Sequence, residues 1–383
     1  MSTHARRFQI HRPQKIAAVL LLIFLLQSLW LLAHLPLDMA ETRATLAGRA
    51  LWSNRQLLGA SSPLIAGDSV LTLRSAGVLA VIAKYWQAQN LEFSIYAAPS
   101  RWLVRLPFAC FGLWLGGALW WVSRRLYGDE GGYVALGLYC FSPPMLLASA
   151  TVAPAILAAW GLFGLIFTAI GVAHTLYAPP RRWRPRIVLL GVAIGVTAGA
   201  NLAAAIAGLV FAIVFMLYLA PGRRFASLGI LLVSSAIATL IFFSFFGFDS
   251  HDLSAAGLSP NLEYLGLTWH RVAELLAVPG GLLEIIAFIC ALVVFLVWTR
   301  TRYFGNFAPL LIALLLPWWP GRFLPGASAI WALPFAFVFV GGIYADLLEP
   351  GFFAGRFRPL VVTTAFVLVG ASAVLSFALL AKA

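Results

Sequence analysis

The sequence predicts an all-α, polytopic integral membrane protein, and three observations lead to this fold class. Of its 383 residues, 62% are hydrophobic and only 10% are charged, whereas a soluble domain carries roughly 25% charged residues. Long apolar runs recur along the chain, and about 20 apolar residues are enough to cross a bilayer. Short clusters of Lys and Arg separate these runs. Because cytoplasmic loops retain Lys and Arg, the clusters should all lie on one face of the membrane.

The basic clusters determine the predicted topology. Sixteen of the 26 Lys and Arg residues belong to them: Arg6, Arg7, Arg12 and Lys15; Arg124 and Arg125; Arg181, Arg182, Arg184 and Arg186; Arg223 and Arg224; Arg300 and Arg302; Arg356 and Arg358. With all of them in the cytoplasm, we expect eleven spans, at 16–35, 104–122, 132–149, 152–174, 187–201, 202–220, 226–247, 280–298, 304–319, 327–347 and 360–380. The N-terminus would then be cytoplasmic and the C-terminus outside.

We expect a single integral membrane domain over residues 1–383, in a bacterial inner membrane. The first span at 16–35 is followed by a large outward loop at 36–103, and the remaining spans lie within 104–380. The first apolar run could be taken for a secretory signal, but it is as long as a span and no A-x-A site follows it, so we expect an uncleaved helix. Residues 69–86 are predicted to form an interfacial or buried helix lying across the outer surface.

Residues 187–220 form one apolar run between two basic flanks. Since both flanks should be cytoplasmic, an even number of crossings must separate them. Two short helices that turn near Asn201 satisfy this condition, and one very long helix does not. Gly191, Gly195 and Gly199 recur at every fourth position, a spacing that lets a neighbouring helix approach closely.

Several classes of partner and site have no support in the composition. The net charge of +13 follows from the positive-inside bias, so no nucleic-acid partner is predicted. Cys110, Cys140 and Cys290 lie inside apolar spans and form neither a disulfide framework nor a metal motif. The chain has no P-loop, GxSxG or HExxH pattern. No cofactor is predicted with certainty, and a divalent cation stays an open alternative.

Asp38 and Glu41 come directly after the first predicted span. A carboxylate at the outer membrane boundary suits a general base that acts on an acceptor hydroxyl or amine while a lipid-linked donor lies in the adjacent leaflet. Asp-x-x-Glu is also a helix-start signature, in which Asp38 caps the following helix and Glu41 completes the capping box. The two interpretations are compatible with each other.

Residues 39–58 are predicted to form an amphipathic helix on the membrane surface. We assign Met39, Leu46, Ala50 and Leu57 to its apolar face and place Arg43 and Arg55 away from that face. Arg43 is therefore a candidate ligand of a lipid phosphate. The alternative is a simply solvated side chain.

Three further arginines and one acid are candidates for function. Arg101 and Arg105 are four residues apart, so they share a helix face and could clamp a phosphate; snorkelling to the interface is the alternative. Arg322 lies on a late outward turn, where it either binds donor phosphate or anchors a helix end. Glu284 lies just inside the eighth predicted span and, as an intramembrane acid, is a functional candidate unless it reaches the interface.

Seven motifs follow one another in an informative order. They are Asp38-x-x-Glu41, Ser62-Pro63-Leu64, Arg105-Leu106-Pro107, Arg124-Arg125-Leu126-Tyr127-Gly128, Phe141-Ser142-Pro143-Pro144, the glycine-spaced double span from Arg186 to Leu219, and Arg322-Phe323-Leu324-Pro325. By this order and spacing, the chain resembles the membrane-embedded glycosyltransferases of the C superfamily (GT-C). The resemblance is greatest to the bacterial branch with aminoarabinose transferases, lipopolysaccharide-core sugar transferases and relatives of protein O-mannosyltransferases.

The resemblance implies transfer of a sugar from a polyprenyl-phosphate donor to a lipid, glycan or protein acceptor on the outer face. It implies that Asp38 is the catalytic base, assisted by Glu41, and that Arg43, Arg101, Arg105 and Arg322 bind the donor phosphate. One departure stands out: many relatives carry an acid at the start of the fourth span, whereas residues 148–155 contain none. Either Glu41 or another outward acid substitutes, or the protein is a non-catalytic lipid-carrier-binding subunit, scaffold or transporter.

Overall fold

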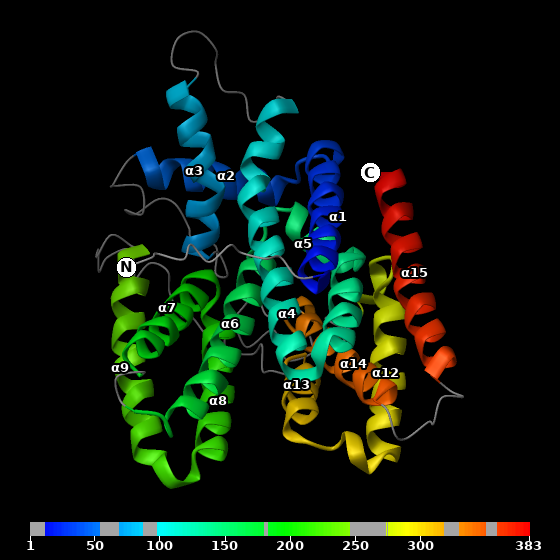
Figure 1. Ribbon diagram of the computed structural model, residues 1–383. Coiled ribbons are helices and arrows are strands. Elements are labelled where there is room, and N and C mark those ends of the chain that lie inside the picture. Colours follow the sequence, from blue (N-terminus) through cyan, green and yellow to red (C-terminus); the bar gives the residue numbers. More distant parts are fainter. Residues whose placement is uncertain are drawn as a thin grey trace, which may run out of the picture.

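The computed structural model describes residues 12–53, 69–86, 98–179, 183–245, 273, 275–317, 329–349 and 358–383. Every regular element in these ranges is a helix, which confirms the predicted fold class (Figure 1). The longer helices are α1 (Arg12–His34), α2 (Met39–Ser53), α3 (Val70–Trp86), α4 (Ala98–Cys140), α5 (Pro143–Ala150), α6 (Pro154–Thr175), α7 (Arg184–Ala200), α8 (Leu202–Leu219), α9 (Arg224–Phe245), α12 (Gly281–Val297), α13 (Phe304–Leu315), α14 (Leu333–Leu348) and α15 (Arg358–Lys382). Three short 3₁₀ helices are η2 (Pro221–Arg223), η4 (Thr299–Thr301) and η5 (Ala329–Trp331).

The predicted number of eleven spans is not confirmed. Among the described residues, seven helical segments are long and apolar enough to cross a membrane. Two further apolar helices, α12 and α13, are shorter, at 17 and 12 residues. The predicted spans 104–122 and 132–149 also differ from the structure, because α4 covers both ranges up to Cys140 and α5 is a separate helix.

Gly128 folds α4 back on itself. Its φ of 80° lies in the left-handed region, which glycine adopts without the steric cost that a Cβ brings. The two halves of α4 then pack against each other, and the Tyr139 hydroxyl donates a hydrogen bond to the Gly112 carbonyl at 2.5 Å. The predicted span 104–122 therefore lies in the first half of α4, and the predicted span 132–149 covers the second half of α4 and most of α5.

The described basic clusters gather at one end of the bundle. The kink of α4, the start of α7, η2, η4 and the start of α15 all lie at the lower end in Figure 1. Hydrogen bonds join several of these segments: Arg223 donates to the Leu176 carbonyl at 2.6 Å, and Arg186 donates to the Gly171 carbonyl at 3.0 Å. We call this end the basic end. A positive-inside pattern predicts that the basic clusters of a folded bundle lie together at one end.

The predicted pair of short helices in 187–220 is α7 and α8. Asn201 separates them, and its side-chain oxygen accepts a hydrogen bond from the Ala204 N–H at 3.1 Å, which caps α8. The glycine spacing on α7 brings α9 close: a Cβ on Gly191 would lie 2.8 Å from Ile237, and one on Gly195 would lie 2.8 Å from Ile241. The predicted close approach is confirmed.

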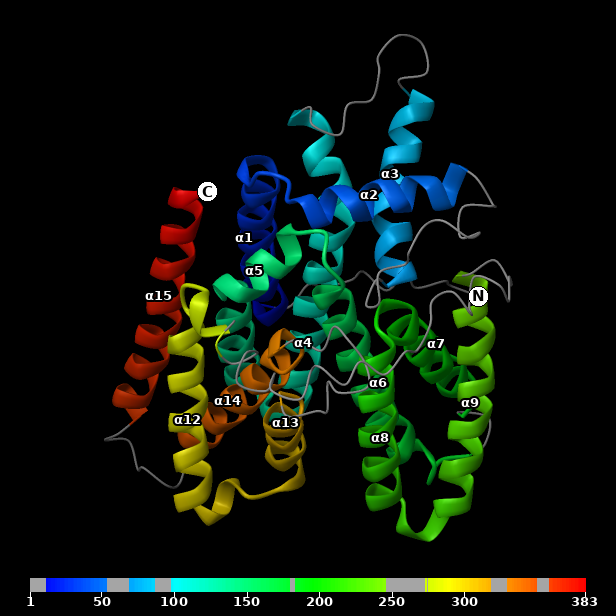
Figure 2. The ribbon, with the colours of Figure 1, turned by 180° about the vertical axis from the view of Figure 1, so that it is seen from behind.

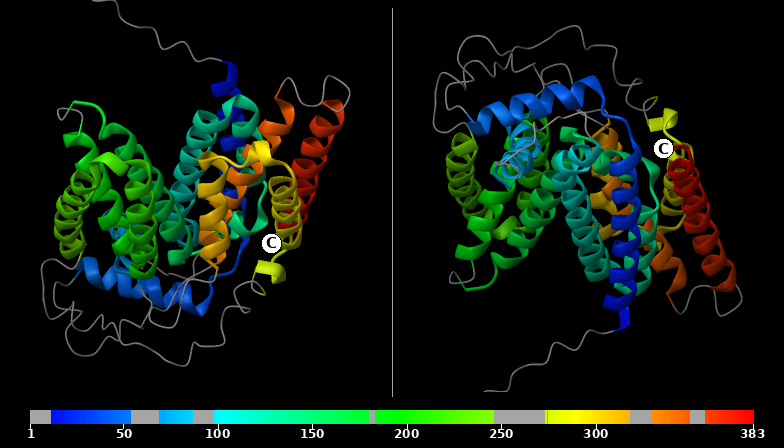
Figure 3. Two further views of the ribbon diagram at one scale, coloured as in Figure 1. Left: turned by 90° about the horizontal axis from the view of Figure 1, so that it is seen from below. Right: turned by 90° about the horizontal axis from the view of Figure 1, so that it is seen from above.

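At the end opposite the basic clusters, α2 lies across the bundle and α3 stands beside it (Figure 2). Viewed along the bundle, α2 runs along one edge of the molecule from α1 to α9 (Figure 3). Two hydrogen bonds hold α3 on the helix ends below it: Ser69 donates to the Gly199 carbonyl at 2.8 Å, and Arg74 donates to the Phe245 carbonyl at 2.6 Å. The predicted helix at 69–86 therefore exists, but it rises from the bundle, and α2 is the helix that lies across it.

The exposed face of α2 differs in one respect from the prediction. Met39 is 73% exposed and Leu46 is 49% exposed, while Glu41 and Thr45 are buried on the other side. Arg43 is exposed as well. With 3.6 residues per turn, it lies one turn from Met39 and just under one turn from Leu46, so it shares their face. Its placement away from the apolar face was wrong.

The crossing of α2 and α3 depends on Gly48. A Cβ there would lie 2.0 Å from the Leu73 carbonyl oxygen, which no side-chain rotation can relieve. We expect Gly48→Ala to lower the free energy of unfolding by about 3 kcal/mol, at the upper end of overpacking effects. Thermal unfolding in detergent measures it.

The matched control is Gly229→Ala on α9, where a Cβ would meet open space. This change should stabilise the protein by roughly 0.5–1 kcal/mol, because alanine is the better helix former. Equal stabilisation by both substitutions would contradict the close crossing.

Candidate functional site

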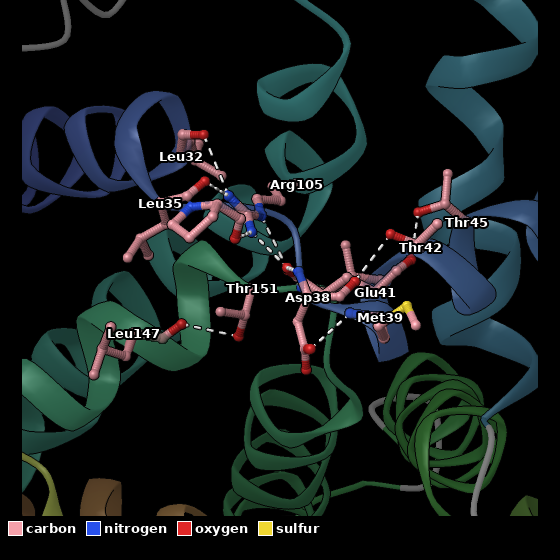
Figure 4. Close-up of polar contacts among 12 residues, drawn as sticks. Leu32, Leu35, Asp38, Met39, Glu41, Thr42, Thr45, Arg105, Leu147 and Thr151 are labelled. Carbon is pink, nitrogen blue, oxygen red and sulfur yellow. Dashed lines mark hydrogen bonds and ion pairs between the residues drawn. The ribbon is translucent and has the colours of Figure 1, made fainter. Parts of the chain in front are cut away.

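The candidate site lies where α1 ends and α2 begins, against α4 and the link between α5 and α6 (Figure 4). The chain leaves α1 at His34 and enters α2 at Met39. This short connection forces a sharp change of direction and exposes the last carbonyls of α1, which have no partner within the helix. Asp38 is the last residue of the connection.

A buried ion pair joins Glu41 and Arg105. The Arg105 Nε donates to Glu41 Oε1 at 3.0 Å, and Nη2 donates to Oε2 at 2.5 Å. The two residues are 5% and 1% exposed. This bidentate geometry is the strong form of a charge-assisted hydrogen bond.

The rest of the Arg105 guanidinium binds the end of α1. Nη1 donates to the Leu35 carbonyl at 2.8 Å and to the Leu32 carbonyl at 3.5 Å, and Nη2 donates to the Pro36 carbonyl at 2.8 Å. A guanidinium has five N–H donors, so these contacts and the two to Glu41 occupy all of them. Arg105 therefore caps α1 and has no donor left for a phosphate.

The Glu41 carboxylate also has all its hydrogen-bonding partners within the protein. Besides Arg105, its carboxylate accepts the Asp38 N–H at 3.0 Å and the Val152 N–H at 2.7 Å. The first contact is half of the predicted capping box. The second fixes the extended link between α5 and α6. One carboxylate thus connects the starts of α2 and α6 with α4.

Asp38 is exposed, in contrast to Glu41. Its Oδ1 accepts the Met39 N–H at 2.6 Å, and its carbonyl accepts the Thr42 N–H at 3.0 Å. The carboxylate does not accept the N–H groups further along α2, so the Asp38 half of the capping box is not formed. Figure 4 shows this carboxylate pointing away from Arg105. Among the residues that the structure describes, none donates a hydrogen bond to its second oxygen.

No family model and no curated protein sequence matches the chain. Solved structures do match. ArnT from Cupriavidus metallidurans in the apo state has a TM-score of 0.59 at 14% identity, over 92% of this chain and 61% of that one. The Archaeoglobus fulgidus oligosaccharyltransferase AglB, in complex with an inhibitory peptide and a dolichol-phosphate, has a TM-score of 0.54 at 13% identity, over 95% of this chain and 56% of that one. Both are GT-C glycosyltransferases.

The chain has the GT-C fold. A second structure of the Archaeoglobus fulgidus oligosaccharyltransferase, in complex with Zn and sulfate, agrees, with a TM-score of 0.53 at 13% identity, over 94% of this chain and 52% of that one. The chain therefore spans little more than half the length of these proteins. At such identities the likeness establishes the fold alone.

The contacts above bear on two of the predicted site residues. In the structure, the Glu41 carboxylate and all five Arg105 donors are engaged with each other and with the main chain, so neither group is free for a proton or a phosphate. Their catalytic and phosphate-binding roles stay predictions. Arg43 is exposed on α2 and stays a candidate. Arg101 lies in the first turn of α4, but its side chain is outside the described residues, and Arg322 is outside them altogether.

Three other features complete the comparison with the sequence. The Ser142 hydroxyl caps α5 by accepting the Met145 N–H at 3.2 Å, whereas Ser62-Pro63-Leu64 and Arg322-Phe323-Leu324-Pro325 lie outside the described residues. Glu284 is only 6% exposed and does not reach the surface. In the described part of the chain, no three His, Cys, Asp or Glu residues are grouped for a metal ion.

The ion pair should contribute strongly to stability. We expect Glu41→Gln to lower the free energy of unfolding by about 3–5 kcal/mol, because it leaves the buried Arg105 charge uncompensated. Thermal unfolding of the purified protein measures this.

Glu349→Gln is the matched control, since Glu349 pairs with Arg300 at 2.9 Å but both side chains are about half exposed. Such pairs contribute roughly 0–1 kcal/mol. If the two substitutions had the same small effect, Glu41 would not be the central contact that the geometry indicates.

Proposed function

We propose that the protein transfers a sugar from a polyprenyl-phosphate donor to a lipid, glycan or protein acceptor, and that Asp38 is the general base. The observation that carries the proposal is the contrast between two neighbouring acids. Glu41 is buried with all its contacts made, while Asp38 is exposed and its carboxylate points away from the ion pair. Only Asp38 is available to a substrate.

The proposed reaction needs one base and one anion-stabilising group. Asp38 takes the proton from an acceptor hydroxyl or amine, the acceptor atom bonds to the anomeric carbon of the sugar, and the bond from that carbon to the phosphate oxygen breaks. The polyprenyl phosphate leaves as an anion, which a nearby cation stabilises. Arg43, Arg101 and Arg322 are the proposed cations, and Arg105 holds the site in shape.

The exposed face of α2 supports a lipid donor. Met39 and Leu46 are 73% and 49% exposed, with Arg43 between them on the same face. A helix with apolar and basic residues on its exposed side favours the boundary between lipid headgroups and acyl chains. A donor in the leaflet on this side would present its phosphate at the boundary between headgroups and acyl chains, beside Asp38.

The similar solved structures add support of a general kind. One holds a dolichol-phosphate, and another is tethered with an acceptor peptide containing the NVT sequon. We propose partners of the same two classes here, namely a lipid-linked donor and an outer-face acceptor. We also propose a bacterial inner membrane location, with the basic end in the cytoplasm and α2 on the outer face.

One observation favours a second candidate function. Residues 148–155 contain no acid, and Glu41, the acid expected to substitute for it, is fully engaged by Arg105 and two main-chain N–H groups. A protein with this arrangement could bind the lipid carrier without transferring the sugar, as a carrier-binding subunit or scaffold.

The test is release of polyprenyl phosphate by purified protein from a panel of polyprenyl-phosphate sugars, in buffer with a panel of lipid, glycan and peptide acceptors, so that an acceptor or water receives the sugar. We expect release by the wild type and a decrease of at least about 100-fold in Asp38→Asn, the lower limit for loss of a general base. Asp129→Asn, which removes an acid at the basic end, should leave release unchanged.

Two other outcomes would contradict different parts of the proposal. Full release by a folded Asp38→Asn variant would refute the assignment of the base. Binding of every donor without release, by a wild type of native stability, would refute the transferase and establish the carrier-binding alternative.

A further inference from the structure

An apolar groove separates α12 from α15. Its volume is about 370 Å³, within the range of roughly 300–1,000 Å³ found for ligand sites. Both helices pack on α14, which forms the floor of the groove, and Figures 1 and 2 show them side by side. The α15 segment is 17% buried, the lowest value among the seven candidate spans. The groove therefore opens sideways, toward lipid.

The polarity of the groove changes along its length. Leu283 and Ile286 line its part near the start of α12, where the lining is apolar. Tyr344, Thr363 and Thr364 line it on α14 and α15, and the two threonines lie near the start of α15, which is at the basic end. The lining is apolar over most of the groove, as an acyl chain requires, and its two threonines lie near the basic end, where a polar head would lie.

Three arginines lie at the basic ends of the helices that form the groove. Arg302 donates to the Phe295 carbonyl at 3.2 Å, so its guanidinium lies against the last turn of α12. Arg300 reaches the end of α14, where it pairs with Glu349 at 2.9 Å. Arg358 begins α15, is exposed and has no hydrogen-bonding partner among the described residues. Two acids, Glu349 and Asp346, lie on the same end of α14, so the three arginines still leave a net positive charge there.

Basic pockets between membrane helices on the cytoplasmic side bind anionic lipid headgroups. We infer that the groove between α12 and α15 holds one anionic phospholipid of the leaflet at the basic end, with an acyl chain along the groove and its phosphate beside Arg358 and Arg302. This lipid is distinct from the proposed donor, whose phosphate belongs with Asp38 at the opposite end of the bundle. Its role is to hold the weakly packed α15 against α12 and α14.

The first experiment locates the lipid. The purified protein is illuminated in nanodiscs of phosphatidylcholine that contain a trace of phosphatidylglycerol with a diazirine in one acyl chain, and the crosslinked peptides are mapped by mass spectrometry. We expect adducts concentrated on groove residues such as Cys290 and Val367. The same diazirine on phosphatidylethanolamine should give several-fold fewer adducts there.

The second experiment measures affinity by native mass spectrometry with phosphatidylglycerol. Arg358→Gln should weaken binding about fivefold, since a basic residue at the membrane surface contributes about 1 kcal/mol. Ala371→Phe, which fills the groove from α15, should abolish the groove adducts. Arg224→Gln makes the same charge change and Val233→Phe also introduces a phenylalanine, both on exposed positions of α9, and neither should change either readout.

Three results would overturn the inference. Equal crosslinking by phosphatidylethanolamine, or adducts spread evenly over all lipid-facing helices, would mean ordinary surrounding lipid. Preferential crosslinking by a diazirine-labelled polyprenyl phosphate would assign the groove to the donor carrier.

Discussion

The buried ion pair between Glu41 and Arg105 is the contact on which the end of this protein opposite the basic clusters depends. Removing two charges from water costs several kcal/mol for each ion, and the attraction between them compensates only when the remaining donors and acceptors are satisfied. Here they are: three carbonyls at the end of α1 and two main-chain N–H groups complete the network. The pair therefore fixes the angle between α1 and α2 and, through Val152, the start of α6.

The position of Asp38 follows from this network. Its N–H is held by Glu41, and its carbonyl begins the hydrogen bonding of α2, so the main chain sets where the carboxylate lies while the carboxylate itself stays exposed. The close crossing at Gly48 and the contacts of Ser69 and Arg74 then hold α2 and α3 on the ends of α7 and α9. A rigid frame around one accessible acid is the arrangement that a general base requires.

Local sequence patterns were enough to predict the helices, but they did not predict the contacts between residues far apart in the chain. Asn201 and the glycines of α7 carry their information in a few neighbouring residues, and both were predicted correctly. Glu41 and Arg105 were each identified as candidates, but their pairing joins positions 64 residues apart, and the Val152 contact joins positions 111 residues apart. No periodicity encodes such contacts. The predicted span 132–149 failed for a different reason, because Ser142-Pro143 is a helix start and was included within a continuous helix.

The most direct test of this account is a cryo-EM structure of the protein in lipid nanodiscs with polyprenyl phosphate bound. The account predicts that the phosphate lies on the exposed side of α2, within reach of Asp38 and Arg43, and that the ion pair between Glu41 and Arg105 stays intact. A phosphate bound directly by Arg105, with Glu41 displaced, would contradict the division between one accessible acid and a buried pair that only positions it.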